Sequence, residues 1–154
     1  MAKYDPLPET DHVVRKVSWT RLRRDEHGNV LGCLWQAFQL REDEKDLSST
    51  WLEHFSSAIG CRLVQAVAAM RQSQMTLTKK TGLALAQVSK ILKCGSDAGL
   101  KFRVIHMPES TNPGYAAILN TPRDDQELLE ILAADAVVET LMVSALDAGL
   151  ITPR

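Results

Sequence analysis

The sequence predicts a compact α+β domain, and three observations support this prediction. Two pairs of short segments rich in β-branched and aromatic residues are each separated by a turn-forming run, which is typical of β-hairpins. Apolar residues at helical spacing lie between and after these pairs. The length of 154 residues, with 45% hydrophobic and 24% charged residues, fits one soluble domain spanning 1–154. We therefore expect two β-hairpins forming a mixed sheet, helices packed on it, and a long acidic C-terminal helix.

The first hairpin is expected after an extended lead-in over residues 1–11, which contains two prolines. Residues 12–19 alternate imperfectly between apolar and polar side chains and favour a strand. The run His27-Gly28-Asn29 is a turn signal, and residues 34–39 have the mixed pattern of a half-buried strand. A hairpin that pairs these two strands is the economical interpretation.

A helix is predicted to begin near residue 50. The run Thr50-Trp51-Leu52-Glu53 has the spacing of a capping box. Gly60 interrupts the helical pattern, which resumes over residues 61–72. We expect two short helices or one kinked helix here, with Trp51 and Phe55 packed under the sheet.

The second half begins with an ambiguous segment. In residues 82–88 the Ala and Leu content favours a helix, but a short apolar run between a Gly and a polar stretch favours a buried strand, which we adopt. Residues 89–98 then form a short helix that ends at Gly99. Residues 101–107 and 115–119 flank a turn rich in Pro, Asn and Gly, which predicts the second hairpin.

The last predicted element is an acidic helix over residues 122–148. Thr121 suits the N-cap and Pro122 suits the first helical position. Its apolar residues cover more than one stripe, so some would stay exposed and form a partner surface. We predict a homodimer, or a complex with a protein from the same operon, through a subset of Leu129, Val137, Leu141 and Met142. The alternative is that the two hairpins bury this helix completely.

Composition excludes several classes of protein. Cys33, Cys61 and Cys94 are odd in number and have no C-x-x-C spacing, which indicates reduced thiols and no metal site. No apolar run is long enough to span a membrane, and the N-terminus lacks a signal-peptide core, so a cytoplasmic location is expected. Nucleotide-binding and hydrolase motifs are absent, and no cofactor is expected.

The net charge of −1 hides a strong segregation of charge. Residues 62–103 carry eight bases against Asp97 alone, and residues 104–147 carry eight acids against Arg123 alone. This asymmetry permits an electrostatic partner, and the basic 62–103 region could bind nucleic acid, although it has no Trp or Tyr for base stacking. The alternative is that the two blocks face each other or are solvated.

One candidate constellation joins His12, Arg15 and Arg41. The two arginines could bind a phosphate or carboxylate through forked hydrogen bonds, and the histidine could act as acid or base. The alternative is a structural one, in which Arg15 pairs with Glu53 or with an acid of the turn that follows Arg41.

A second constellation is His106 with Asn112 and Tyr115. His12 and His106 could form a two-histidine pair that cleaves RNA phosphodiesters, one as base and one as acid. The alternative is that His106, within the apolar run FRVIHM, is a packed residue of a strand.

The stretch AFQLREDEKDLSSTWLEHF (37–55), with FRVIHMPESTNPGYAAI (102–118) and the acidic segment after it, resembles a group of small uncharacterised bacterial proteins from mobile-element or phage-defence gene neighbourhoods. The resemblance implies a bacterial cytoplasmic accessory protein. A His is expected in that pattern where this chain has Tyr115, which weakens a catalytic role for the second hairpin.

We predict a non-catalytic protein-binding accessory or inhibitor subunit that acts on a co-encoded bacterial effector, as in a defence or toxin-antitoxin type system. Two alternatives remain open. One is a phosphodiesterase or ribonuclease that uses His12 and His106, and the other is nucleic-acid binding through residues 62–103.

Overall fold

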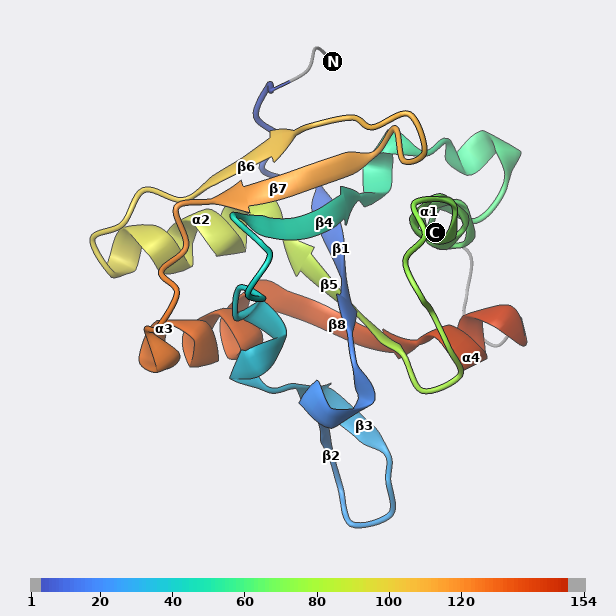
Figure 1. Ribbon diagram of the computed structural model, residues 1–154, viewed down its shortest axis with the longest axis horizontal. Helices are drawn as coiled ribbons and strands as arrows, with labels where there is room; N and C mark the ends of the chain where they lie inside the picture. The colour runs from blue at the N-terminus through green and yellow to red at the C-terminus, as the bar shows by residue number, and fades with distance from the viewer. Residues whose placement is uncertain (1–3, 150–154) are drawn as a thin grey trace.

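The computed structural model describes residues 4–149, and its centre is an antiparallel sheet of six strands in the order β6-β7-β4-β1-β5-β8 (Figure 1). The strands are β1 (His12–Val17), β4 (Leu47–Trp51), β5 (Gly82–Gln87), β6 (Arg103–His106), β7 (Tyr115–Leu119) and β8 (Val137–Met142). Helices and strands together confirm the α+β class. The sheet is antiparallel throughout, however, and not mixed as the sequence predicted.

Two of the predicted strand assignments are confirmed. The second hairpin is β6 paired with β7, with Val104 opposite Ile118. The ambiguous apolar segment is the strand β5, which pairs with β1 on one side and β8 on the other. Because β5 is flanked by strands and covered on both faces, it has a continuous apolar run and no polar alternation.

The first predicted hairpin is wrong. Strand β1 pairs with β4 and β5, which are distant in sequence, and residues 35–38 form a 3-10 turn. The hairpin in this region is smaller and consists of β2 (Leu22–Arg24) and β3 (Val30–Cys33), which project from the body of the molecule (Figure 1). The turn signal itself is confirmed, since Gly28 has a positive φ of 84° and lies at the tip of this hairpin.

The helix predicted near residue 50 is also wrong. Residues 47–51 are the strand β4, because Thr50 pairs with Val14 on one side and Tyr115 on the other. The two strand neighbours override the local capping-box signal. The predicted helix over 61–72 is confirmed as α1 (Arg62–Gln72).

Short 3-10 turns complete the first half of the chain. They are η1 (Trp19–Arg21), η2 (Trp35–Phe38), η3 (Leu52–His54) and η4 (Ser57–Ile59).

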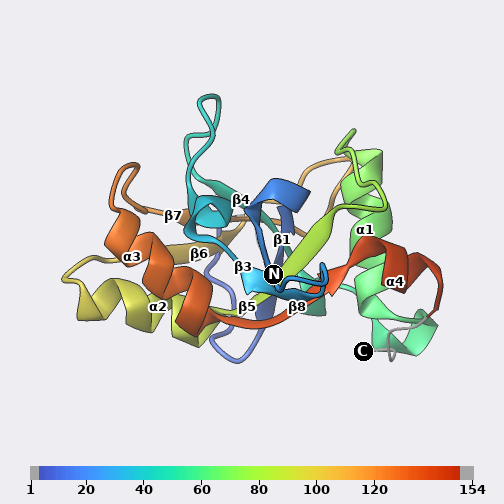
Figure 2. The same cartoon turned by 90° about the horizontal axis from the view of Figure 1, so that it is seen from below.

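Helices cover both faces of the sheet. Figure 2 shows α2 (Val88–Asp97) and α3 (Gln126–Ile131) on one side, and α1 with α4 (Val143–Asp147) on the other. We call these sides the α2 face and the α1 face. Side chains alternate between two buried cores, so that Val13 lies in the core of the α2 face and Val14 in the core of the α1 face.

The predicted helix end at Gly99 is confirmed by its positive φ of 75°.

The single long helix predicted over 122–148 is wrong. The chain forms α3, then a π-helical turn η5 (Leu132–Ala136), then the strand β8 and the short helix α4. Asp125 caps α3 by accepting a hydrogen bond from the Leu128 amide, so Thr121 is not the N-cap. The segment VVETLM has β-branched residues and completes the sheet beside β5, which decides strand over helix. Among residues 4–149, no helix is both long and apolar enough to cross a bilayer.

Candidate functional site

The two histidines of the proposed RNA-cleaving pair lie on opposite faces of the sheet. His12 shares the α1 face with Val14, and its Nδ1 lies 2.7 Å from Glu53 Oε2. His106 pairs with Ala116 on the α2 face, where it is buried and its ring packs edge-on against Trp51 at 5.1 Å. Its Nε2 is 2.8 Å from the Pro113 carbonyl oxygen.

Distance separates the two histidines as well. Strands β6 and β1 are three positions apart in the sheet, which corresponds to about 14 Å at the usual strand spacing. An acid and a base acting on one phosphodiester must both come within hydrogen-bonding reach of it. The structure therefore does not bring His12 and His106 together, and the surroundings of His106 are those of a packed residue.

The proposed anion site at Arg15 is occupied by the protein's own groups. Arg15 is only 5% exposed, and its guanidinium donates to the Ala37 carbonyl at 2.6 Å and to the Ser48 carbonyl at 2.8 Å. Its two terminal nitrogens each lie 3.3 Å from an oxygen of Glu44. Glu44 belongs to the acidic turn after Arg41, so the structural alternative for Arg15 is the arrangement found.

Glu44 is the centre of this network. Burial by itself raises the pKa of Glu44, but the charge of Arg15 and hydrogen bonds from Arg15 and from the Arg41 and Ser48 amides outweigh that effect and lower it to about 2. The carboxylate is thus fully used inside the fold. The Arg41 side chain is 45% exposed with its Nε 3.4 Å from Glu44, so part of its guanidinium remains accessible.

The four predicted partner-binding residues fall into two groups. Leu129 is completely buried in the core of the α2 face and cannot contact a partner in the folded protein. Val137, Leu141 and Met142 lie in β8 and are half-buried against the two cores. The exposed apolar residue of this strand is Val138, which is not among the four predicted residues.

The two edges of the sheet differ. At β6 the N-terminal segment runs alongside, with the Leu7 amide donating to the Val104 carbonyl at 3.0 Å and the His106 amide donating to the Asp5 carbonyl at 2.9 Å. Residues 4–7 of the predicted lead-in therefore cover this edge, and its residues 1–3 lie outside the described part of the chain. No segment within residues 4–149 makes equivalent backbone hydrogen bonds along the outer side of β8.

The register identifies the backbone groups on that outer side. The Val143 amide donates to the Thr81 carbonyl, and the paired residues Leu83 and Leu141 follow two positions along. In an antiparallel pair, hydrogen-bonded positions alternate with positions whose amides and carbonyls point away from the partner strand. The backbone groups of Thr140 and Met142 therefore point away from β5.

A cleft of about 540 Å³ lies between β8 and the hairpin strand β3. Leu31 and Val138 stand on its opposite walls and are 54% and 44% exposed. Arg23 and Glu130 also line the cleft, so it combines apolar contacts with charges of both signs. Cys33 lies at its wall, and burial raises the pKa of this thiol to about 11, which makes it a poor nucleophile.

The basic 62–103 block does not form one patch. Helices α1 and α2, which carry half of its bases, lie on opposite faces of the sheet. Arg71 pairs with Asp147 of the acidic block at 3.1 Å, and Lys93 pairs with Asp97 at 2.7 Å. Part of the charge segregation is thus resolved within the fold.

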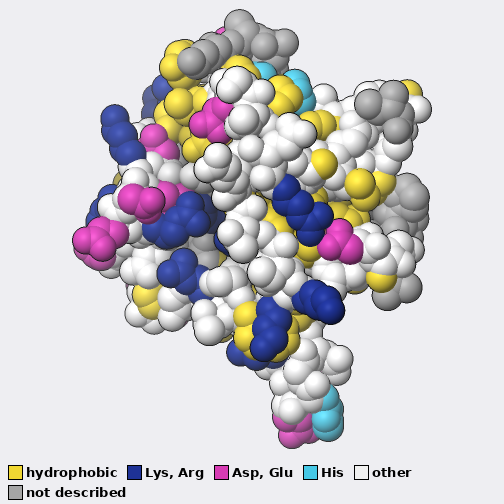
Figure 3. Space-filling view, turned by 45° about the vertical axis from the view of Figure 1, so that its right-hand side comes forward, with side chains coloured by type: hydrophobic (Ala, Val, Ile, Leu, Met, Phe, Trp, Pro, Cys, Tyr) yellow, Lys and Arg dark blue, Asp and Glu magenta, His cyan; other side chains and the backbone are white. Residues whose placement is uncertain are grey.

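Another basic cluster lies at the base of the hairpin. Two cations lie over the ring of Trp19, with Arg24 Cζ 4.3 Å and Lys80 Nζ 5.9 Å from the ring centroid. Figure 3 shows basic side chains over an apolar patch where the hairpin leaves the body. These cations occupy the indole surface that a nucleic-acid base would need for stacking.

Comparison with known proteins gives no relative from which a site could be transferred. No protein-family model matches this chain, and no curated protein or solved structure is significantly similar to it. The geometry of the residues described above is therefore the basis for the functional proposal.

Proposed function

We propose that this protein is a protein-binding module that takes an extended segment of a partner protein as an additional strand on β8. The observation that carries the proposal is the outer side of β8, along which no segment of residues 4–149 forms backbone hydrogen bonds, beside a cleft with exposed apolar walls. Strand addition of this kind gains affinity from main-chain hydrogen bonds and specificity from alternate side chains.

The contrast between the two sheet edges supports this function. An uncovered edge strand invites pairing with other chains, and proteins usually block it. Here the β6 edge is covered by residues 4–7. In β8, by contrast, the backbone amide and carbonyl groups of Thr140 and Met142 point away from β5. A bulge near Val138 interrupts the regular part of the strand at its start, so the added segment is short.

The cleft suggests the chemistry of the segment. Leu31 and Val138 favour an apolar side chain between them, and Arg23 and Glu130 favour polar or charged neighbours. An alternating apolar and polar segment meets both conditions, because successive side chains of a strand point to opposite sides.

This proposal keeps the binding role expected from the sequence and relocates it from a helix to an edge strand. That the partner is a co-encoded effector, and that the module inhibits it, remain predictions. The two-histidine alternative has no support in the positions of His12 and His106. The nucleic-acid alternative is weakened because α1 and α2, which carry half of the bases of residues 62–103, lie on opposite faces of the sheet, and Arg71 and Lys93 are paired with acids.

Selection of peptides from a random display library on the immobilised protein tests the proposal. Thr140→Pro removes one outward amide donor and leaves the pairing with β5, since proline is tolerated on the open side of an edge strand. We expect the selected peptides to bind the wild type and Thr140→Val, and to lose binding to Thr140→Pro. Circular dichroism checks that the proline variant is folded.

Two results would contradict the proposal. One is a failure to enrich any peptide, and the other is undiminished binding to folded Thr140→Pro. A dimer in light scattering that Thr140→Pro converts to a monomer would identify the added strand as β8 of a second copy in place of a different protein.

A further inference from the structure

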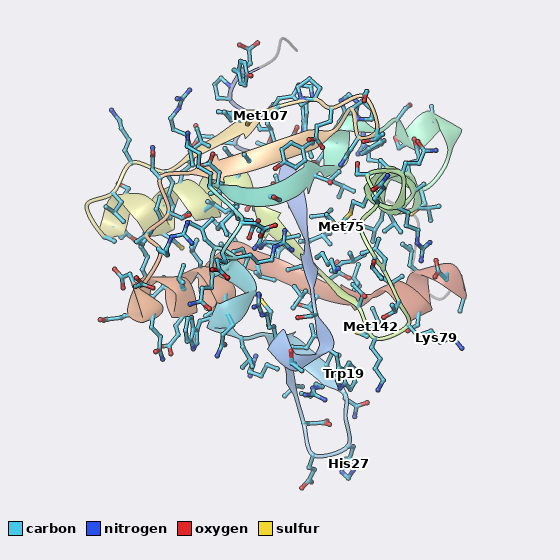
Figure 4. All side chains as sticks on the ribbon, viewed as in Figure 1. Trp19, His27, Met75, Lys79, Met107 and Met142 are labelled. Carbon is cyan, nitrogen blue, oxygen red and sulfur yellow. The ribbon has the colours of Figure 1, made fainter. Side chains whose placement is uncertain are left out.

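We propose that a second site, on the α1 face, binds the phosphoryl group of a small phosphomonoester or free phosphate. A pocket of about 120 Å³ lies between the C-terminal end of α1 and the strands β1, β4 and β7. In Figure 4, Met75 lies between α1 and these strands, where it closes one side of the pocket. The site is separate from the cleft between β3 and β8 and does not depend on the binding role proposed above.

An excess of positive charge distinguishes this pocket. Arg15, Lys16 and Arg41 line it, but Glu44, the carboxylate that contacts two of them, already accepts both terminal nitrogens of Arg15. Within residues 4–149, Lys16 has no carboxylate within 4.0 Å. An anion in the pocket would therefore meet Lys16, which no carboxylate in the described part of the chain neutralises, and Arg41, which shares Glu44 with Arg15.

The environment of Lys16 supports the same conclusion. Burial, and next the charge of Arg41, lower the pKa of the Lys16 ammonium group. Holding two cations near each other in a half-buried pocket is unfavourable without a counter-charge. A bound dianion would reverse that effect, and the guanidinium of Arg41 offers the planar donor geometry that suits phosphate oxygens.

Hydroxyl groups supply further donors. The side chains of Ser48, Thr50 and Tyr115 share the α1 face because Thr50 pairs with Tyr115 and Ser48 lies two residues before it. The Tyr115 hydroxyl donates to Ser48 Oγ at 3.1 Å, which leaves the Ser48 hydroxyl hydrogen for another acceptor. Ser48 and the two cations thus reach the pocket from different elements, as a tetrahedral oxyanion with several acceptor oxygens requires.

The size of the pocket limits the ligand. A single water molecule needs a cavity volume of roughly 10–15 Å³, whereas pockets for drug-sized molecules measure about 300–1,000 Å³. The observed volume of about 120 Å³ falls between these values. It accommodates an oxyanion and leaves any attached organic group outside. Glu109 also lines the pocket and opposes the anion, which gives the experiment a variant with the opposite sign.

Calorimetric titration with inorganic phosphate, at constant ionic strength maintained with sodium chloride, tests this site. We expect Lys16→Met and Arg41→Gln each to weaken binding by about tenfold, the size of one charge-assisted hydrogen bond. Glu109→Gln should bind more tightly. The matched control is Lys45→Met, since Lys45 is exposed and does not line the pocket, and its affinity should equal that of the wild type.

Phenyl phosphate in a parallel titration separates the two sources of the phosphoryl group. Tighter binding than phosphate, still lost in Lys16→Met, indicates a phosphomonoester, and equal binding indicates the free ion. Absence of phosphate binding at millimolar concentration, or an equal loss in Lys45→Met, would overturn the proposal. Because Arg41 also contacts Glu44, Lys16→Met carries the test if Arg41→Gln disturbs the fold.

Discussion

The Arg15 guanidinium and the Glu44 carboxylate face each other inside the protein, with 3.3 Å between Nη1 and Oε2 and 3.3 Å between Nη2 and Oε1. This pair connects β1 to the turn that precedes β4, and both side chains are almost fully buried. Buried charges are tolerated when each polar atom has a partner, and here backbone carbonyls and amides complete the set.

Removing one charge of this pair should be costly. We predict that Glu44→Gln lowers the free energy of unfolding by about 3–5 kcal/mol, because Arg15 would remain buried and charged without its counter-ion. Urea denaturation measures this loss, with Glu42→Gln at an exposed position of the same turn as the control. A loss equal to that of the control would show that the pair contributes little.

The same pair predicts the response to acid. The pKa of Glu44 is depressed from 4.5 to about 2 in the folded protein, so its contribution to stability is fully present above about pH 4.5 and is lost as the pH falls toward 2. We expect the wild type to lose stability across this interval more steeply than Glu44→Gln. Urea midpoints at several pH values test this, and parallel curves for the two proteins would contradict it.

Trp51 is a core residue, although it lies at the end of a strand and not in the predicted helix. It is buried against the core of the α2 face, and its indole Nε1 donates to Asp11 Oδ2 at 2.9 Å. Trp51→Ala should cost about 3–5 kcal/mol in unfolding free energy. Trp51→Phe keeps an aromatic ring and should cost less. A cost below about 1 kcal/mol for the alanine variant would instead indicate a surface role.

Leu129 and Val138 should respond in opposite ways. Leu129 is completely buried, so Leu129→Ala should lower the unfolding free energy by about 2–5 kcal/mol. Val138 is exposed at the cleft, so Val138→Asp should leave the thermal midpoint nearly unchanged and weaken binding of the selected peptides. Peptide binding that survives Val138→Asp would remove this side chain from the interface.

Gly82 provides a test of how the hairpin is attached to the sheet. A Cβ atom at this position would lie 2.6 Å from Cδ2 of Leu22, which comes from β2. Gly82→Ala should therefore destabilise the protein by about 1–3 kcal/mol through overpacking. When Leu22 is already replaced by Ala, the Gly82→Ala substitution should lower the unfolding free energy by less than it does in the wild type. Strictly additive losses would show that the two residues are not in contact.

The sequence by itself determined the elements whose signals are local. Helix α1 follows from apolar residues at helical spacing, and the end of α2 follows from Gly99, whose left-handed conformation suits glycine. The β6-β7 hairpin follows from two apolar runs around a turn rich in Pro, Asn and Gly. In the candidate sites, the sequence also offered an acid of the turn after Arg41 as the partner of Arg15.

Tertiary structure alone decided the elements whose partners are far away in the chain. The run Thr50-Trp51-Leu52-Glu53 has the sequence pattern of a capping box at a helix N-terminus. Thr50 is nevertheless in a strand, because Val14 and Tyr115 flank it in the sheet. Residues 137–142 continue the apolar pattern of the predicted C-terminal helix, yet they form β8 because β5 offers them a free edge. Strand order also placed His12 and His106 on opposite faces and left the outer side of β8 unpaired within residues 4–149. Hydrogen bonds between distant strands stabilise these arrangements, and no local pattern encodes which strands will meet.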